Sequence, residues 1–182
     1  MYSIAKLKQK ENISEFLLFL WQMEDLLRGI EFDLARLDDE ILPAIIDEGE
    51  RLKTRKWLAE MAKDMGLASL QLSGHHRETH EVLNEMGMLQ QTLLSVTKNT
   101  PFTKAYEAVQ PVLDDFRKKG EQVPKSDMET ALTALYGMLT LRIAKKEISE
   151  ETSNAMVPIS AYLRELTRAY HLMKAGKPFY SK

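Results

Sequence analysis

The sequence predicts an all-α protein, an irregular bundle of six or seven helices that forms a single domain over residues 1–182. Apolar residues recur at helical spacing along most of the chain, and no segment shows the strict alternation of a half-buried strand. Hydrophobic residues make up 44% of the chain and charged residues 29%, which is typical of globular domains. A chain of 182 residues is also long enough to bury roughly 70% of the surface of its unfolded form.

Helix starts are the clearest local signals. Asn12 is followed by Glu15, and Ser126 is followed by Glu129, which is the spacing of a capping box. In the first half of the chain we expect a helix over residues 13–30, a short helix after Asp33 that stops or restarts at Pro43, and a helix over residues 44–65 that ends at Gly66. In the second half we expect helices from Ser73 to about Thr97, over residues 104–119, and from Asp127 to about Lys145. Ser149 should open a last helix.

Two of these helices should form the centre of the bundle. The helix from Ile13 and the helix from Asp127, which contains "ALTALYGMLTL", are apolar on nearly every face. Gly137 weakens the second helix by about 1 kcal/mol relative to alanine, so we expect the backbone of a neighbouring element to approach it closely. The last two helices should form an antiparallel hairpin, because few residues separate them.

Charge and composition exclude several classes of function. With 25 basic and 27 acidic residues the formal net charge is −2, so no overall field would attract nucleic acid or anionic lipid. The basic stretch "RLKTRK" at 51–56 is interpreted as a solvated helix face rather than as a nucleic-acid site. The chain has no cysteine, which excludes disulfides, thiolate metal sites and cysteine nucleophiles.

The N-terminal segment is not expected to be an export signal or a membrane anchor. Three lysines precede the apolar run "FLLFLW" at 16–21, but Glu11 and Glu15 interrupt the approach and no small-residue cleavage site follows. The run is also much shorter than the roughly 20 apolar residues that span a bilayer. We expect a cytoplasmic protein without membrane or nucleic-acid partners.

Three stretches of the chain resemble a known family. They are "KENISEFLLFLWQMEDLLR", "ALYGMLTLRIAKKEIS" and "ISAYLRELTRAYH". Together they are similar to an all-helical family of Bacteroidetes that is catalogued as domain of unknown function 4924, and the resemblance covers essentially the whole chain. It implies a helical fold and a bacterial, cytoplasmic origin, and it implies no activity.

Three of the four histidines lie in "SGHHRETHEVL", residues 73–83. His76 and His80 are four residues apart, so one face of a helix could present both to a zinc ion, with His75 close by. A zinc protease would need glutamate directly after the first histidine, where this chain has Arg77, and a zinc site needs a third protein ligand from elsewhere. We therefore expect a solvated first helical turn, with no metal and no cofactor.

The sequence contains no other catalytic motif. Each serine lacks the strand-turn-helix elbow of a hydrolase nucleophile, and the eight glycines form no phosphate-binding loop.

The most informative polar residues lie on the two central helices. "WQMED" places Trp21, Gln22, Glu24 and Asp25 in the first, and Arg142 follows eleven uncharged residues in the second. One interpretation is that Glu24 pairs with Arg28 on the surface while Arg142 reaches water. The alternative is a polar cluster of Gln22, Asp25 and Arg142 that binds a small anion or fixes the packing, with Arg142 paired to Asp25 or Glu24.

These observations favour a binding or assembly module over an enzyme. The tail "KPFYSK" could anchor a partner, and ten methionines with little net charge suggest a homodimer. The alternative is a metal-dependent hydrolase or another small-molecule enzyme, which should show a concave site where titratable groups converge.

Overall fold

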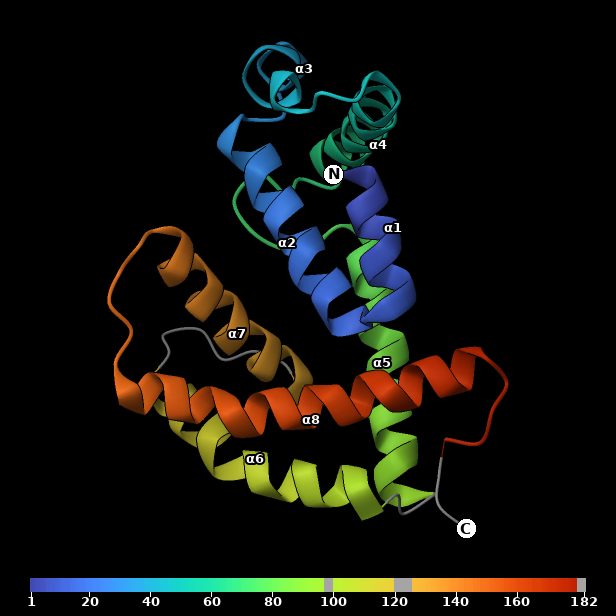
Figure 1. Ribbon diagram of the computed structural model, residues 1–182, viewed down its shortest axis with the longest axis vertical. Coiled ribbons are helices and arrows are strands. Elements are labelled where there is room, and N and C mark those ends of the chain that lie inside the picture. The colour runs from blue at the N-terminus through green and yellow to red at the C-terminus, as the bar shows by residue number, and fades with distance from the viewer. Residues whose placement is uncertain (97–99, 120–125, 180–182) are drawn as a thin grey trace. The chain divides into compact units, whose positions relative to one another are not determined.

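The computed structural model of the chain describes residues 1–96, 100–119 and 126–179. Over these ranges it contains eight α-helices and no strand, which confirms the all-α prediction but adds at least one helix to the expected number (Figure 1). Contacts divide the chain into two compact units, Met1–Val82 and Leu83–Lys182. The single-domain organisation stays a prediction. Across the described ranges, no helix has the length and apolar character needed to cross a membrane.

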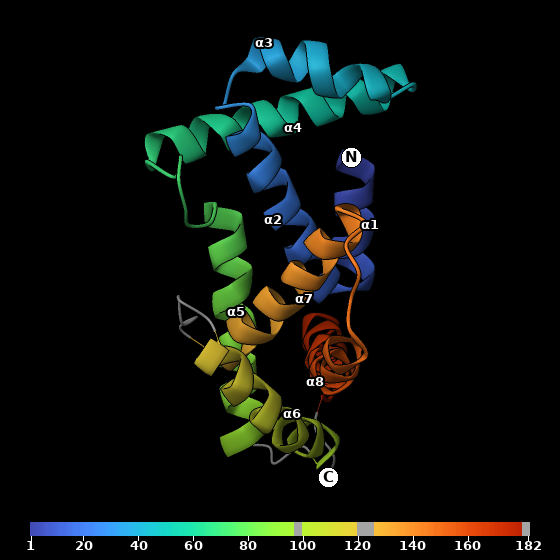
Figure 2. The same ribbon diagram turned by 90° about the vertical axis from the view of Figure 1, so that its left-hand side faces the viewer.

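The first unit is built from three long helices and a short irregular connection. The elements are α1 (Tyr2–Glu11), α2 (Ile13–Gly29), α3 (Leu34–Arg36), a π-helical turn (Leu37–Ile41), a 3-10 turn (Leu42–Ala44) and α4 (Glu48–Leu67). Helix α1 was not predicted from the sequence. Helix α1 lies beside α2. Helix α4 crosses the N-terminal end of α1, where the backbone N–H of Tyr2 donates to Thr54 Oγ1 at 3.1 Å (Figure 2).

Capping side chains decide where two of these helices start. As predicted, Asn12 caps α2, because its side chain accepts from the backbone N–H of Glu15 at 3.2 Å. The expected helix from residue 44 instead begins at Glu48, because the carboxylate of Asp47 accepts from the backbone N–H of Glu50 at 2.6 Å. Pro43 lies in the 3-10 turn before it.

As predicted, α2 is buried along most of its length. Its apolar residues recur on more than one face, so it can contact neighbours on several sides. Its buried residues are Ile13, Ser14, Phe16, Leu17, Leu20, Trp21, Met23, Glu24 and Leu27. The only acid among them is Glu24.

The second unit contains most of α5 (Arg77–Ser95), together with α6 (Thr100–Lys119), α7 (Asp127–Ile143) and α8 (Glu150–Lys174). From the sequence, α5 and α6 were expected to start at Ser73 and residue 104, and both positions are wrong by about one turn. Helices α6 and α8 lie along one another (Figure 1).

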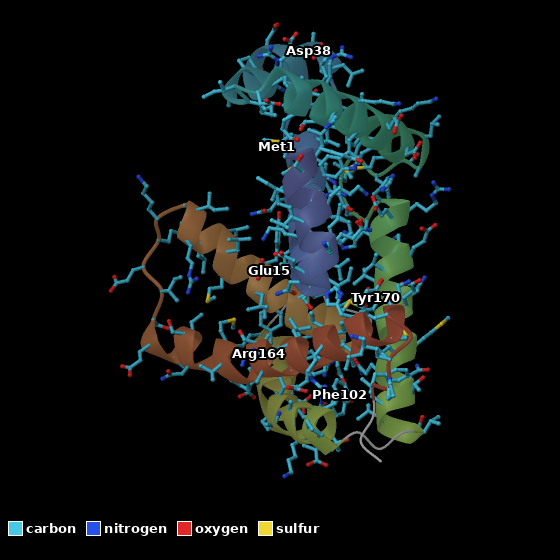
Figure 3. All side chains as sticks on the ribbon, turned by 45° about the vertical axis from the view of Figure 1, so that its right-hand side comes forward. Met1, Glu15, Asp38, Phe102, Arg164 and Tyr170 are labelled. Carbon is cyan, nitrogen blue, oxygen red and sulfur yellow. The ribbon has the colours of Figure 1, made fainter. Side chains whose placement is uncertain are left out.

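Aromatic side chains fill the contact between α6 and α8. The ring of Phe102 lies 5.8 Å from that of Tyr162, and the ring of Tyr106 lies 5.9 Å from it. Tyr170, further along α8, donates a hydrogen bond to Glu85 Oε2 on α5 at 2.8 Å (Figure 3). Phe102 and Tyr162 are fully buried, so this contact forms the core of the second unit.

The predicted capping box opens α7. Ser126 Oγ accepts from the backbone N–H of Glu129 at 3.2 Å and donates to the Glu129 carboxylate at 3.0 Å. The helix is buried only in its first half, however, where Met128, Thr130, Ala131, Leu132 and Ala134 are covered. The expectation of a helix buried all round is therefore wrong for the second half, in which Ile143 is 65% exposed.

A polar cluster fastens the start of α7 to α6. The carboxylate of Asp127 accepts from Tyr106 Oη at 2.6 Å, from Gln110 Nε2 at 3.4 Å and from the guanidinium of Arg117. Burial alone would raise the pKa of Asp127, but the bonds from Tyr106 and Arg117 outweigh it and hold the pKa below its ordinary value of 3.8. Burial and the bond to Asp127 raise the pKa of Tyr106 to about 12.

We predict that Asp127→Asn lowers the free energy of unfolding by about 1–2 kcal/mol at neutral pH. A carboxylate with a lowered folded pKa stabilises the protein above its unfolded pKa, and this stabilisation is lost as the pH falls through the folded value. The difference from the unmodified protein should therefore shrink below pH 3.8. Urea unfolding at several pH values measures it, with Asp115→Asn, 69% exposed, as the control. A difference that does not change with pH would contradict the prediction.

Candidate functional site

Glu24 is the centre of a buried hydrogen-bond cluster in the first unit. Its side chain is fully buried on α2, and one carboxylate oxygen accepts from the backbone N–H of His76 at 3.0 Å and from Thr79 Oγ1 at 2.6 Å. The other oxygen lies 2.7 Å from Nδ1 of His75. A buried carboxylate is tolerated when donors satisfy both of its oxygens, as they do here.

Glu24 stabilises the start of α5, which begins at Arg77. The first N–H groups of a helix have no partner inside the helix, and a negative charge beside them is favourable. Glu24 supplies such a charge from α2, at the backbone N–H of His76 and the hydroxyl of Thr79. The cap predicted at Ser73 is instead provided by His76, whose Nδ1 accepts from the backbone N–H of Glu78 at 3.3 Å, and Glu24 adds its charge from another helix.

Trp21 holds the ring of His75 in place. The two rings are stacked, with centroids 4.6 Å apart and planes 14° apart, and the edge of His80 faces His75 at 6.0 Å. Because an ionised carboxylate only accepts hydrogen bonds, Nδ1 of His75 is the donor to Glu24. The His75 side chain is 29% exposed, so the cluster reaches the surface at this ring.

Arg28 fixes the loop that precedes α5. Its Nε donates to the carbonyl of Leu70 at 3.0 Å, a terminal nitrogen donates to the carbonyl of Gly74, and the other pairs with Asp25 at 2.9 Å. Gly74 has φ +93°, and a Cβ there would lie 2.9 Å from Leu70 Cδ2. Glycine is therefore required for this loop conformation.

The structure brings together part of the predicted polar cluster. Trp21 and Glu24 meet, but their partners come from residues 75–79. A surface pair of Glu24 with Arg28 is wrong, because Glu24 is buried and Arg28 pairs with Asp25. Gln22 is half-buried on α2. Arg142 is exposed near the end of α7 in the second unit, and its pairing with Asp25 stays a prediction.

The histidines make more contacts than the sequence suggested. His76 is 9% exposed, and its Nε2 lies 3.4 Å from Asp64 Oδ2, so a fully solvated turn is wrong for this residue. His80 is exposed. Within the ranges that the structure describes, no group of three His, Asp or Glu side chains is placed to hold a metal ion.

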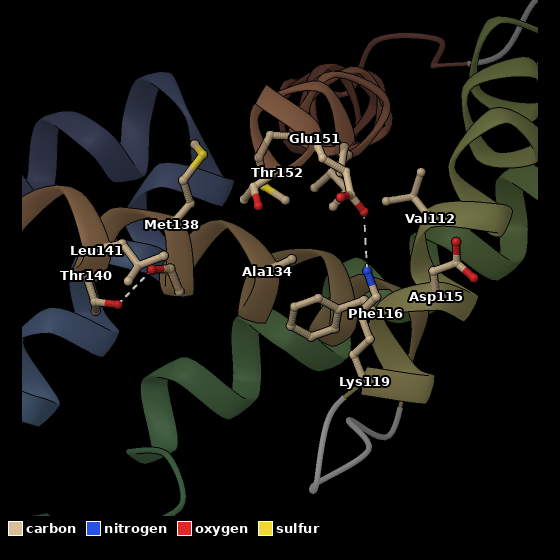
Figure 4. Close-up of a pocket in the computed structure, with 14 residues that line it drawn as sticks. Val112, Asp115, Phe116, Lys119, Ala134, Met138, Thr140, Leu141, Glu151 and Thr152 are labelled. Carbon is tan, nitrogen blue, oxygen red and sulfur yellow. Dashed lines mark hydrogen bonds and ion pairs between the residues drawn. The ribbon is translucent and has the colours of Figure 1, made fainter. Parts of the chain in front are cut away.

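The second unit contains a cavity of about 700 Å³ that was not predicted from the sequence. It lies between α6, α7 and α8 (Figure 4), and α7 and α8 separate toward the 144–149 connection (Figure 1). Most of its lining is apolar, contributed by Val112, Phe116, Ala134, Gly137, Met138, Leu141, Ala155, Met156 and Ile159. A volume and lining of this kind are typical of small-molecule binding sites.

Gly137 is part of the cavity wall. A Cβ built at this position would meet nothing within 4 Å outside its own helix. The expectation that a neighbouring backbone approaches Gly137 is therefore wrong. The missing side chain leaves empty space instead, and this is the signal that could have pointed to the cavity: a glycine in the middle of an otherwise apolar helix.

The comparisons with known proteins give a family. Residues 2–177 match the family described as Domain of unknown function (DUF4924). The chain belongs to this family. No curated protein and no solved structure was found to match it. The resemblance seen in the sequence is thus confirmed.

We predict that Glu24→Gln lowers the free energy of unfolding by about 2–4 kcal/mol. The amide of glutamine has one oxygen and one NH2 group, so its NH2 group would face donors that now bond to the carboxylate. The control is Asp25→Asn, which removes the charge of a neighbour that is 54% exposed and should cost less than about 1 kcal/mol. Urea unfolding followed by the fluorescence of Trp21, in a Trp57→Phe background, measures both. Equal losses in the two variants would contradict the role given to Glu24.

Proposed function

We propose that the protein is a binding module without catalytic activity, and that its binding site is the cavity between α6, α7 and α8. The observation that carries the proposal is an apolar cavity of about 700 Å³, with Gly137 exposed in its wall. Unfilled apolar volume destabilises a protein, because the lining atoms lose contacts that a side chain or ligand would supply. A ligand that fills it therefore gains binding energy from apolar contacts alone.

The chemistry of the lining favours binding over catalysis. Its titratable side chains are Asp115, Lys119 and Glu151, and all three belong to surface ion pairs. An enzyme needs acid, base or nucleophilic groups that converge on a reacting atom in a water-excluded site. Lys119 and Glu151 are 75% and 85% exposed, so they mark the mouth of the cavity rather than its interior.

The Glu24 cluster is assigned a structural role within this proposal. The carboxylate receives three donors and joins α2 to the start of α5 and to the loop before it. An anion beside Trp21 and Glu24 would face a buried negative charge, which disfavours it. Anion binding through Asp25 and Arg142 stays a prediction.

A homodimer is also part of the proposal. Val157 on α8 and Ile143 on α7 are 66% and 65% exposed, and exposed apolar side chains favour association when they form a patch. The aromatic tail "KPFYSK" was predicted to anchor a partner, and its residues 180–182 lie outside the described part of the chain.

We predict that Gly137→Leu abolishes the binding of N-phenylnaphthylamine, an uncharged apolar dye whose fluorescence rises in apolar sites, while stabilising the free protein. The leucine side chain occupies the space beside Gly137 that the dye would need, and removing a helical glycine contributes about 1 kcal/mol. Dye titration and urea unfolding measure the two effects.

Gly87→Leu is the matched control for Gly137→Leu. Gly87 is also a helical glycine of the second unit, and a Cβ added to it would meet nothing within 4 Å, but it does not line the cavity. This variant should gain helix stability and keep dye binding. Unchanged dye binding in Gly137→Leu would contradict the proposed site, as would equal loss in both variants.

A further inference from the structure

Every polar side chain that lines the cavity already has a partner in the protein. Charged residues pair with charged residues, and hydroxyls bond to nearby residues in the chain. The pairs are Asp115 with Lys118 at 3.4 Å, Lys119 with Glu151 at 3.5 Å, Thr140 Oγ1 with the carbonyl of Gly137 at 2.8 Å, and Thr152 Oγ1 with Ser149 Oγ at 2.9 Å. A polar ligand would lose its bonds to water without receiving directed replacements.

The apolar lining is aliphatic rather than aromatic. Among the described lining residues Phe116 has the only ring, so these residues could not stack a flat ligand between two aromatic faces. Met138 and Met156 contribute unbranched side chains that adapt to the shape of a flexible neighbour. These features favour a ligand that bends to fit and that makes contacts through methylene groups.

The charges at the mouth are of both signs and are solvated. Lys119 and Glu151 face one another on α6 and α8, and Figure 4 shows this pair at the edge of the cavity. The electric fields of two opposite charges that lie close together in water largely cancel. The pair therefore attracts neither an anion nor a cation strongly. The head group of a ligand therefore remains in water, and its chain determines the affinity.

We propose that the cavity holds the unbranched aliphatic chain of an uncharged amphiphile, with its polar end at the Lys119–Glu151 mouth. This inference rests on the proposed function and names the chemical class of its ligand. Gly137 leaves space along α7 into which the chain extends. The site selects against polyether chains, because the two threonine hydroxyls in its lining are already bonded to neighbouring residues and its other described interior residues are apolar.

The test is the displacement of N-phenylnaphthylamine by a series of straight-chain alcohols from hexanol to dodecanol. Burying one methylene contributes about 0.8 kcal/mol, so each added methylene should strengthen binding by about fourfold until the chain fills the cavity. A polyether of the same length as dodecanol should bind at least about 100-fold more weakly. The affinities of dodecanoate and dodecylamine, compared with that of dodecanol, show the effect of a charged head group on a chain of the same length.

Two variants test where the head group and the chain of the ligand lie in the cavity. Glu151→Gln frees Lys119 and should improve dodecanoate relative to dodecanol, which locates the head group at the mouth. Gly137→Leu should end the gain with chain length at a shorter alcohol or abolish binding, while Gly87→Leu should not. Circular dichroism confirms that each variant is folded, and Gly137→Ala replaces Gly137→Leu if the larger residue prevents folding.

The outcomes distinguish two failures. If the dye binds and Gly137→Leu expels it, but affinity does not rise with chain length or the polyether binds equally well, the aliphatic assignment is wrong and the site stands. If Gly137→Leu leaves dye and alcohol binding unchanged, the proposed function is wrong together with the inference.

Discussion

The second unit depends on a helix that is apolar on nearly every face but is buried only in its first half. Helix α7 is held at its start, where Asp127 bonds to Tyr106, Gln110 and Arg117 of α6. At its end, Lys145 adopts φ +53° and the N–H of Lys146 returns to the carbonyl of Leu141, so the chain turns sharply toward α8. With both ends fixed, the second half of α7 stands apart from α8, and the cavity occupies the space between them.

Such an arrangement has a physical consequence for function. Apolar helices normally close on their neighbours, because buried apolar surface is the main stabilising term in folding. The lining around Gly137, Met138 and Leu141 does not receive that stabilisation from the protein itself. A chain-shaped apolar ligand supplies the missing contacts, and the paired polar side chains at the mouth make no competing demand.

The first unit shows a different solution to a polar residue inside an apolar helix. Glu24 is buried, yet its carboxylate accepts from the backbone N–H of His76 and from the hydroxyl of Thr79 at the start of α5. Trp21 and Arg28, from the same helix, then hold His75 and the preceding loop. The cluster fixes the conformation of residues 70–79, and a neutral side chain at position 24 could not satisfy the same donors.

Helix caps formed by residues close in the chain were predicted well from the sequence, and contacts between residues far apart in the chain were not. The caps at Asn12, Ser126 and Ser149 involve residues three positions apart, so their spacing is visible in the chain. The partner of Glu24 is 51 residues away, and no periodicity connects the two. The prediction of a close backbone at Gly137 is wrong, because a missing side chain indicates that space is needed without showing whether a backbone or a cavity occupies it.

The central claim is tested most directly by NMR of the methionine methyl groups while dodecanol is added. Met138 and Met156 line the cavity, whereas Met61 and Met65 are buried on α4 in the first unit and serve as internal references. We expect the Met138 and Met156 signals to shift in a saturable manner and those of Met61 and Met65 to stay in place. Unshifted signals from Met138 and Met156, or equal shifts at all four residues, would contradict the account.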